Sequence, residues 1–205
     1  MSWTALLPLA GLASAKSRLR AASPDDAAHR RLVTAIRDDT AAALRASRAV
    51  ARVVAVSPDP DCLEWAAQHG FVALAEAEPG LNPALDLAAA YAADSWPGDG
   101  LVALVGDLPA ATGPALDALL ARLGPGQRGF VADHHEVGTT LLAAAASVPL
   151  EPRFGVDSAQ WHRATGAVPL EADLGLRWDI DTPADLVAAL AAVPVGDFTR
   201  GALVP

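Results

Sequence analysis

The chain has little cysteine, few aromatic residues and fewer basic than acidic side chains, and each shortage excludes a class of protein. Cys62 is the only cysteine, so it has no partner for an internal disulfide, and a buried thiol in a reducing compartment is expected. There are 15 Lys and Arg residues against 24 Asp and Glu, and the net charge is -9. Neither nucleic acid nor an anionic membrane surface is therefore an expected partner. If a nucleoside triphosphate binds, a few positioned basic side chains and metal ions must hold its negative charge, because the overall charge of the protein does not.

Long hydrophobic runs are also lacking, since none approaches the roughly 20 residues that a membrane span requires. The segment 5–15 resembles the apolar part of a secretory signal. However, Lys16, Arg18 and Arg20 follow this segment, whereas a signal peptide carries its basic residues before the apolar part. We therefore expect a cytoplasmic protein.

Hydrophobic residues are abundant, at 52%, and charged residues make up only 19%, which suits a sheet covered on both faces. Apolar runs of strand length alternate with helical patterns, as in βαβ architectures. We expect an α/β fold with a mostly parallel central sheet in one domain spanning residues 1–205. The expected strands are 3–9, 52–57, 71–75, 101–105, 130–132, 139–145 and 175–180. The expected helices are 24–45 (with Pro24 in its first turn), 60–69, 83–93, 114–123 and 182–192.

Asp107 directly follows the most apolar strand, Leu101 to Val105. In open α/β sheets, ligands bind beyond the carboxyl ends of the strands. Asp107 is therefore a candidate ligand-binding residue, although an aspartate before Pro109 also suits a turn or a helix cap.

A second acidic group, Asp179 and Asp181, precedes a helix that Pro183 begins. In an extended segment, residues two apart point to the same side, and two crowded carboxylates favour a bound cation. Together with Asp107 they would supply the oxygen ligands that Mg²⁺ prefers, and Mg²⁺ is the cofactor that nucleotidyl transfer requires. Asp185 is explained by the helix dipole alone.

The loop from Gly11 to Leu19 is rich in small residues and contains Lys16 and Arg18. Such a loop offers backbone N–H groups and positive charge to phosphates. It matches neither a Walker A nor a GxGxxG motif, and a solvated basic loop is the alternative.

Several other polar residues are weaker candidates. Asn82 caps a helix or contacts a nucleotide, and Thr140, Gly155 and Ser158 lie in regions suited to a small anionic acceptor. His134 and His135 would face opposite sides of a strand and are interpreted as loop surface, and His162 as structural. No serine lies in a G-x-S-x-G elbow, so a hydrolase triad has no support.

The order of these motifs is specific. Between residue 3 and about residue 196 the chain contains, in this order, PLAGLASAKSRL, GLN, GDLP, GTT, PRFGVDS and LRWDIDTPADL. This combination resembles the guanylyltransferases of coenzyme F-420 biosynthesis (the CofC/FbiD family). The resemblance implies a three-layer, Rossmann-like nucleotidyltransferase fold of the GT-A type with a small β insertion. It also implies transfer of GMP from GTP to a phosphorylated three-carbon acid, with release of pyrophosphate and delivery of the product to a downstream transferase.

The resemblance assigns roles to individual residues. Asp107, Asp179 and Asp181 match the family's Mg²⁺ ligands, and Asp107 and Lys16 are the expected catalytic residues. The acid-binding positions are Thr140, Gly155 and Ser158, and the nucleotide-binding positions are Lys16, Arg18, Asn82 and Gly106. One departure is Ala10, because members usually carry a lysine shortly after the proline that is Pro8 here; Lys16 or Arg18 would then supply the phosphate contact.

Alternatives remain at this point. Phosphoenolpyruvate is favoured over 2-phospho-L-lactate and 3-phosphoglycerate, because the alanine-rich composition is typical of actinobacterial members. Another phosphorylated acceptor, such as a sugar phosphate or a molybdopterin, and a non-catalytic nucleotide-binding relative are the competing interpretations. The number of metal ions and the oligomeric state stay open.

Overall fold

The computed structural model describes residues 2–11, 15–76 and 80–204. Its strands form one sheet in the order β3-β2-β1-β4-β6-β5-β7, in which β6 alone runs antiparallel to its neighbours. The strands are β1 (Trp3–Pro8), β2 (Val50–Ser57), β3 (Val72–Ala75), β4 (Gly100–Leu104), β5 (Arg128–Ala132), β6 (Thr139–Ala144) and β7 (Val168–Pro169). The predicted mostly parallel α/β sheet is confirmed, and the expected small β insertion is the β5–β6 hairpin, which belongs to the same sheet.

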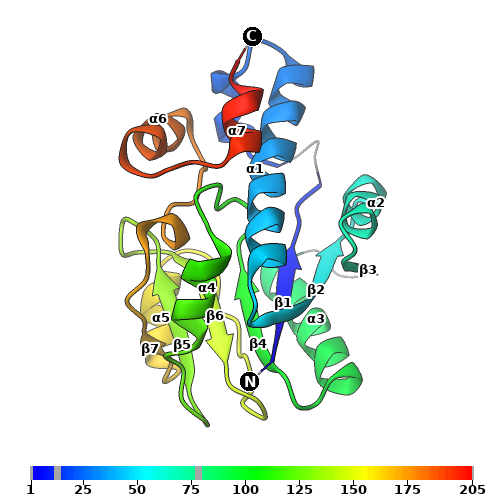
Figure 1. Ribbon diagram of the computed structural model, residues 1–205, viewed down its shortest axis with the longest axis vertical. Helices are drawn as coiled ribbons and strands as arrows, with labels where there is room; N and C mark the ends of the chain where they lie inside the picture. The colour runs from blue at the N-terminus through cyan, green and yellow to red at the C-terminus, as the bar shows by residue number, and fades with distance from the viewer. Residues whose placement is uncertain (1, 12–14, 77–79, 205) are drawn as a thin grey trace.

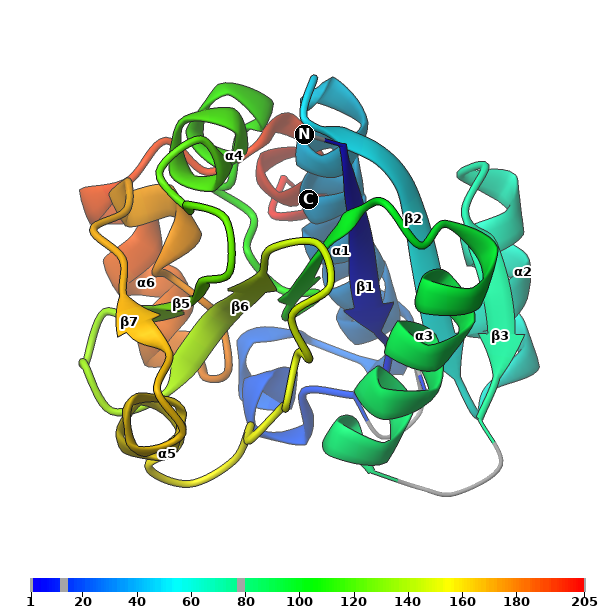
Figure 2. The same cartoon turned by 90° about the horizontal axis from the view of Figure 1, so that it is seen from below.

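Helices cover both faces of the sheet, as Figure 2 shows. One face carries α1 (Asp26–Ala46), α2 (Pro60–Gln68) and α4 (Gly113–Leu120), and the other carries α3 (Leu81–Ser95) and α5 (Ser158–Ala164). The 3-10 helices η1 (Ser17–Ala22) and η2 (Leu174–Leu176) and the helices α6 (Pro183–Ala192) and α7 (Asp197–Ala202) complete the fold.

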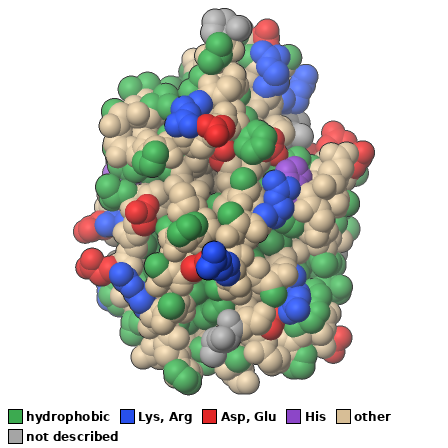
Figure 3. Space-filling model, viewed as in Figure 1, with side chains coloured by type: hydrophobic (Ala, Val, Ile, Leu, Met, Phe, Trp, Pro, Cys, Tyr) green, Lys and Arg blue, Asp and Glu red, His purple; other side chains and the backbone are tan. Residues whose placement is uncertain are grey.

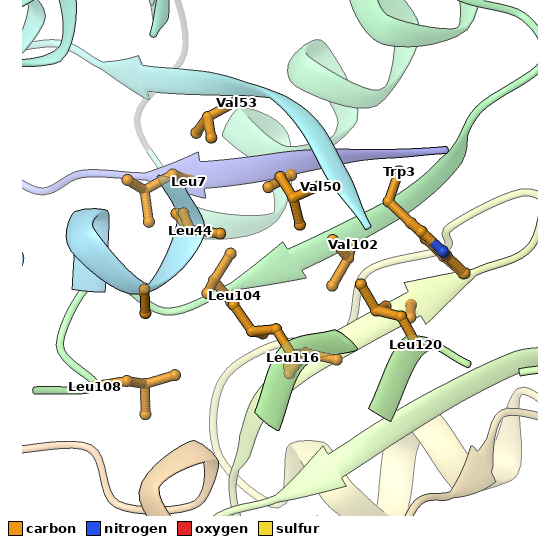
Figure 4. Packing of buried hydrophobic residues seen from close by; sticks show 14 of the residues in the cluster. Trp3, Leu7, Leu44, Val50, Val53, Val102, Leu104, Leu108, Leu116 and Leu120 are labelled. Atoms are coloured by element: carbon orange, nitrogen blue, oxygen red, sulfur yellow. The ribbon is translucent and has the colours of Figure 1, made fainter. Parts of the chain in front are cut away.

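The alternation of side chains along the strands separates two core layers. In β1, Ala5 and Leu7 pack with the α1, α2 and α4 side, whereas Leu6 packs with α3, because successive residues of a strand point to opposite faces. Figure 4 shows the first layer, where Leu44 of α1 and Leu116 of α4 lie over the strands. Full burial of each such leucine contributes roughly 1.5–3 kcal/mol to folding.

A third apolar cluster lies beyond the carboxyl ends of the parallel strands. The first half of α1 extends past the sheet, beside α7 and near α6 (Figure 1). There it buries Leu32 and Ile36 against Leu19 of η1, Ile180 and Leu186 of α6. This cluster places η1 and the segment before α6 next to the edge of the sheet where ligands are expected.

Three sequence-based predictions about these elements were wrong. The expected strand 175–180 is instead η2 followed by irregular chain. The side chain of Asp173 accepts a bond from the N–H of Gly175 at 2.9 Å, and the N–H of Ile180 donates to a loop carbonyl, that of Asp107.

Helix α1 begins at Asp26 and not at Pro24, because the Asp25 side chain caps it by accepting from the N–H of Ala28 at 2.7 Å. Helix α3 begins at Leu81 with Gly80 as its cap, so Asn82 is not the cap.

The distribution of charged side chains on the surface agrees with the excess of acidic over basic residues in the sequence. On the face in Figure 3, Lys and Arg side chains occur singly or in small groups among acidic ones, and they form no continuous basic area. Among the helices in the described part of the chain, none is both long and apolar enough to cross a bilayer.

Candidate functional site

Three carboxylates meet beyond the carboxyl end of β4. Asp107 lies in the loop after this strand, and Asp179 and Asp181 lie in the segment between η2 and α6. One oxygen from each lies within 4.8 Å of the other two. The N–H of Ile180 donates to the carbonyl of Asp107 at 3.2 Å, which fixes the segment on the loop. The predicted convergence of the three aspartates is confirmed, although Asp179 and Asp181 lie outside any strand.

Lys16 brings a positive charge into this group. Its ammonium donates to Oδ2 of Asp107 and to Oδ1 of Asp181. Lys16 directly precedes η1 and has a left-handed backbone with φ of 54°. The basic loop singled out in the sequence therefore reaches the acidic cluster through Lys16, whereas its residues 12–14 lie outside the described part of the chain.

The charges in this cluster do not balance. Three carboxylates face one ammonium, and burial, followed by the neighbouring Asp181 carboxylate, raises the pKa of Asp179 above its ordinary value. Asp107 is only 8% exposed, and its buried Oδ1 has no hydrogen-bond partner among the described residues. A buried, unpartnered carboxylate oxygen among further carboxylates fits a divalent cation, and the all-oxygen ligand set suits Mg²⁺. Asp107, Asp179 and Asp181 are thus the residues that could hold it.

The cluster forms one wall of a cavity of about 610 Å³, a volume within the usual range for small-molecule sites of roughly 300–1,000 Å³. The cavity runs along the ends of β1 and β4 toward α3. Its lining includes the predicted nucleotide-binding residues Lys16, Arg18 and Gly106, together with Asp107 and Asp181.

Two charged residues of the cavity were missed in the sequence. Arg37 of α1 is 7% exposed and lines the cavity, and its guanidinium donates to the carbonyl of Ala10 and to Sγ of Cys62. Arg37 shares a helix face with Val33 and Ala41. A charged residue on an otherwise apolar helix face was the feature of the sequence from which its role in the cavity could have been inferred. Glu76, after β3, lines the cavity as well and accepts a bond from the N–H of Gly80 at 2.7 Å. As expected, Cys62 is buried.

The predicted acid-binding residues lie near the same edge of the sheet but outside the lining of this cavity. The buried hydroxyl of Thr140 donates to the carbonyl of Leu176 at 2.6 Å, and so holds η2. Ser158 is buried at the start of α5, and Gly155 is exposed with a φ of 130°.

Asn82 connects α3 to the segment that contains Gly155. Its side-chain amide donates to the carbonyl of Phe154 at 3.0 Å and accepts from the N–H of the same residue at 2.8 Å. Both ends of the amide therefore bind the backbone next to Gly155, and Asn82 does not line the cavity.

His162 has the structural role that the sequence suggested. Its ring is fully buried, Nε2 accepts from the N–H of Arg153 at 2.9 Å, and Nδ1 lies 2.9 Å from Oγ1 of Thr139. Because Nε2 is an acceptor, the ring is neutral and Nδ1 carries the proton. Burial, followed by the charges of Arg128 and Arg153, lowers the pKa of His162 from 6.5 to about 4.

This shift predicts a loss of stability in mild acid. Between pH 6.5 and pH 4 the unfolded chain binds a proton at His162 that the folded protein does not, so stability is fully present above pH 6.5 and falls as the pH is lowered. From pH 7.5 to pH 5 we expect this residue to remove about 2 kcal/mol from the free energy of unfolding. Urea unfolding at both pH values, for the wild type and His162→Gln, measures it. An unchanged pH dependence in the variant would contradict the assignment.

His134 and His135 lie in the turn between β5 and β6, as their interpretation as loop residues predicted, and their ring centroids are 3.7 Å apart. Only on a strand would they face opposite sides. In this turn each of them offers a ligand atom within 4.8 Å of the other's. Asp185 lies in the first turn of α6, as predicted, and its side chain also completes a capping box with Thr182, which was not predicted from the sequence.

Comparison with known proteins identifies the family. A phosphoenolpyruvate guanylyltransferase of Streptomyces avermitilis is 44% identical to this chain over 207 residues, which cover 98% of the chain and 94% of the relative. The chain belongs to the phosphoenolpyruvate guanylyltransferase family. A member from Sphaerobacter thermophilus is 39% identical and covers 96% of both chains. The resemblance seen in the ordered motifs is confirmed.

The wider family and the fold agree with this. The MobA-like NTP transferase domain matches residues 30–160. A crystal structure from Desulfovibrio desulfuricans G20, assigned to the nucleotide-diphospho-sugar transferases, superposes with a TM-score of 0.72 and covers 94% of this chain and 87% of its own. At 18% identity this likeness concerns the fold alone.

Proposed function

We propose that this protein transfers GMP from GTP to phosphoenolpyruvate and releases pyrophosphate. The observation that supports it most is the joining of Lys16 to Asp107 and Asp181 at the wall of the cavity, with Asp179 beside them. This group combines a cation-binding carboxylate set with a basic side chain for phosphates. The relatives that share 39% to 44% of their residues with this chain carry the same activity in their name.

In the proposed reaction, a phosphate oxygen of phosphoenolpyruvate attacks the α-phosphorus of GTP. The bond from this phosphorus to the oxygen that bridges the α- and β-phosphates breaks, and pyrophosphate leaves with the bonding electrons. The nucleophile belongs to the substrate, so the protein needs no nucleophile of its own. Its task is positioning and charge stabilisation, which account for most catalysis of such transfers.

Asp107, Asp179 and Asp181 would hold Mg²⁺, which offsets the charge of the triphosphate when bound. We assign Lys16 to the negative charge that develops on the phosphates during transfer, since its ammonium lies within this carboxylate group. Arg18 and Gly106 line the same cavity and are assigned to the nucleotide.

Thr140, Gly155 and Ser158 are assigned to the acid. The β5–β6 turn connects their region to the segment that carries Asp179, because the N–H of Ala159 donates to the carbonyl of Val137 at 3.1 Å and the N–H of His134 donates to the carbonyl of Arg177 at 2.8 Å. We assign Asn82 to the boundary of the two substrates, where its bonds to Phe154 hold the Gly155 segment. The guanidinium of Arg37 donates to the carbonyl of Ala10. Arg37 therefore places a positive charge beside the position at which family members usually carry a lysine.

The wider setting is part of the proposal. We infer one nucleotidyltransferase domain over residues 1–205, action in the cytoplasm, and delivery of the product to a downstream transferase of coenzyme F-420 biosynthesis. The lone buried Cys62 agrees with a reducing compartment.

The test is a pyrophosphate-release assay with mass spectrometry of the product. We expect release from GTP only when Mg²⁺ and a phospho-acid are both present. With phosphoenolpyruvate, 2-phospho-L-lactate and 3-phosphoglycerate in competition, the main product should have the mass of GMP joined to phosphoenolpyruvate. ATP, CTP and UTP, each supplied in place of GTP, serve as the control nucleotides. Folded protein that releases no pyrophosphate with any of the three acids would refute the function.

A further inference from the structure

A second group of metal-ligating side chains lies outside the aspartate site. His134 and His135 of the β5–β6 turn and Asp185 in the first turn of α6 each offer one ligand atom, and these atoms lie within 4.8 Å of one another. Two segments that are separated by about fifty residues in the sequence thus bring two imidazoles and a carboxylate together.

The position of the His134 ring is set by its surroundings. It stacks on Trp178 with ring centroids 4.4 Å apart and an interplanar angle of 7°, and its backbone N–H donates to the carbonyl of Arg177 at 2.8 Å. Its Nδ1 is nevertheless buried, and within the described part of the chain it has no hydrogen-bond partner. A buried polar atom in a fixed ring that no protein group satisfies is costly unless a ligand satisfies it.

The other two side chains complete the set without loss of their existing contacts. Asp185 uses Oδ2 to accept from the N–H groups of Asp181 and Thr182, and among the described hydrogen bonds none uses its Oδ1. The side chain of His135 is exposed, and its ring lies against that of His134 with centroids 3.7 Å apart. In a tetrahedral zinc site with bonds of about 2.0–2.1 Å, ligand atoms lie about 3.3 Å apart, so modest side-chain rotations bring the three ligands to bonding distance.

We propose that His134, His135 and Asp185 bind a late first-row transition metal ion, with Zn²⁺ as the preferred occupant. Imidazole nitrogens select Zn²⁺ over Mg²⁺, whereas the three-aspartate site offers only oxygen and suits Mg²⁺. The chain then holds two neighbouring cation sites of different chemistry. Zn²⁺ would tie the β5–β6 turn to α6 at a point that adjoins Asp181, and would stabilise the fold by mass action.

The test is calorimetry with Zn²⁺ in buffer that contains saturating Mg²⁺, which keeps the aspartate site filled. We expect one equivalent of Zn²⁺ to bind to the wild type. His135→Gln and Asp185→Asn should each weaken this binding at least tenfold. His135 is exposed and asparagine still accepts the capping bonds of α6, so both variants should fold.

Two matched variants show where the ion sits. His69→Gln removes a histidine at the end of α2, far along the chain from the cluster, and Asp179→Asn alters the aspartate site; both should bind Zn²⁺ like the wild type. Co²⁺ substituted for Zn²⁺ should give the visible absorption of a site with nitrogen ligands, and His135→Gln should lose it. Zn²⁺ binding that survives His135→Gln, or that disappears in Asp179→Asn, would overturn the proposal.

Discussion

Replacement of Asp107 by asparagine is expected to lower kcat/KM for guanylyl transfer by at least about 10³-fold, which corresponds to about 4 kcal/mol of transition-state stabilisation. Asp107 belongs to the carboxylate group, contacts Lys16 and has a buried oxygen to which no described residue donates a hydrogen bond. The amide removes one of three negative charges from the cation site, while it keeps the shape of the side chain. Steady-state kinetics across a Mg²⁺ titration measure the effect.

The same substitution should leave the thermal stability unchanged or raise it. Asp107 is a buried carboxylate close to two further carboxylates, so the amide removes a buried negative charge, while Lys16 keeps Asp181 as a partner. Asp94→Asn, an exposed carboxylate on α3, is the matched control and should retain full activity. Asp107→Asn with activity within tenfold of the wild type would exclude Asp107 as a metal ligand.

Gly175→Ala is expected to lower the free energy of unfolding by about 3 kcal/mol, the upper part of the range for overpacked sites. A Cβ atom at this position would lie 2.1 Å from the carbonyl oxygen of Ala110, and this neighbour is backbone that cannot rotate away. The segment from η2 to α6 must move to accommodate it, and it carries Asp179 and Asp181. Since a misplacement of about 1 Å lowers turnover by about 10²-fold, kcat should fall as well.

Urea unfolding and kcat at saturating substrate test both effects. Gly98→Ala is the control, because a Cβ there meets nothing within 4 Å and the backbone is not left-handed. It should be neutral or slightly stabilising. If Gly175→Ala keeps both the stability and the kcat of the wild type, the packing of η2 on Ala110 does not position the aspartates.

Much of the sheet was predictable from local patterns. The apolar runs of β1, β2 and β4 differ little from the predicted ranges, because strands buried on both faces require continuous hydrophobic residues. Asp107 was located for the same reason, since it directly follows such a run. The start of α6 was likewise predictable, because Pro183 suits the first position of a helix, where its missing N–H costs no hydrogen bond.

Other elements depended on partners that are distant in the sequence. Residues 175–180 have the composition of a strand, but Gly175 packs on Ala110 and Ile180 bonds to the loop of Asp107, so the segment pairs with no strand. Helix α7 is capped by the buried carboxylate of Asp39, which accepts from the N–H of Thr199 at 2.8 Å. No pattern around residue 199 shows that this cap exists.

By itself, then, the sequence determined the alternation of buried strands and helices, the three aspartates that end up together and the family, since hydrophobic periodicity, capping and motif order are local properties. The tertiary structure decided which side chains meet. Lys16 reaches Asp107 and Asp181 across 91 and 165 residues, Arg37 holds Ala10, and His134 and His135 turn toward Asp185. These contacts depend on how η1, α1 and α6 pack beyond the sheet, and that packing is set by the shared burial of apolar residues from all three elements.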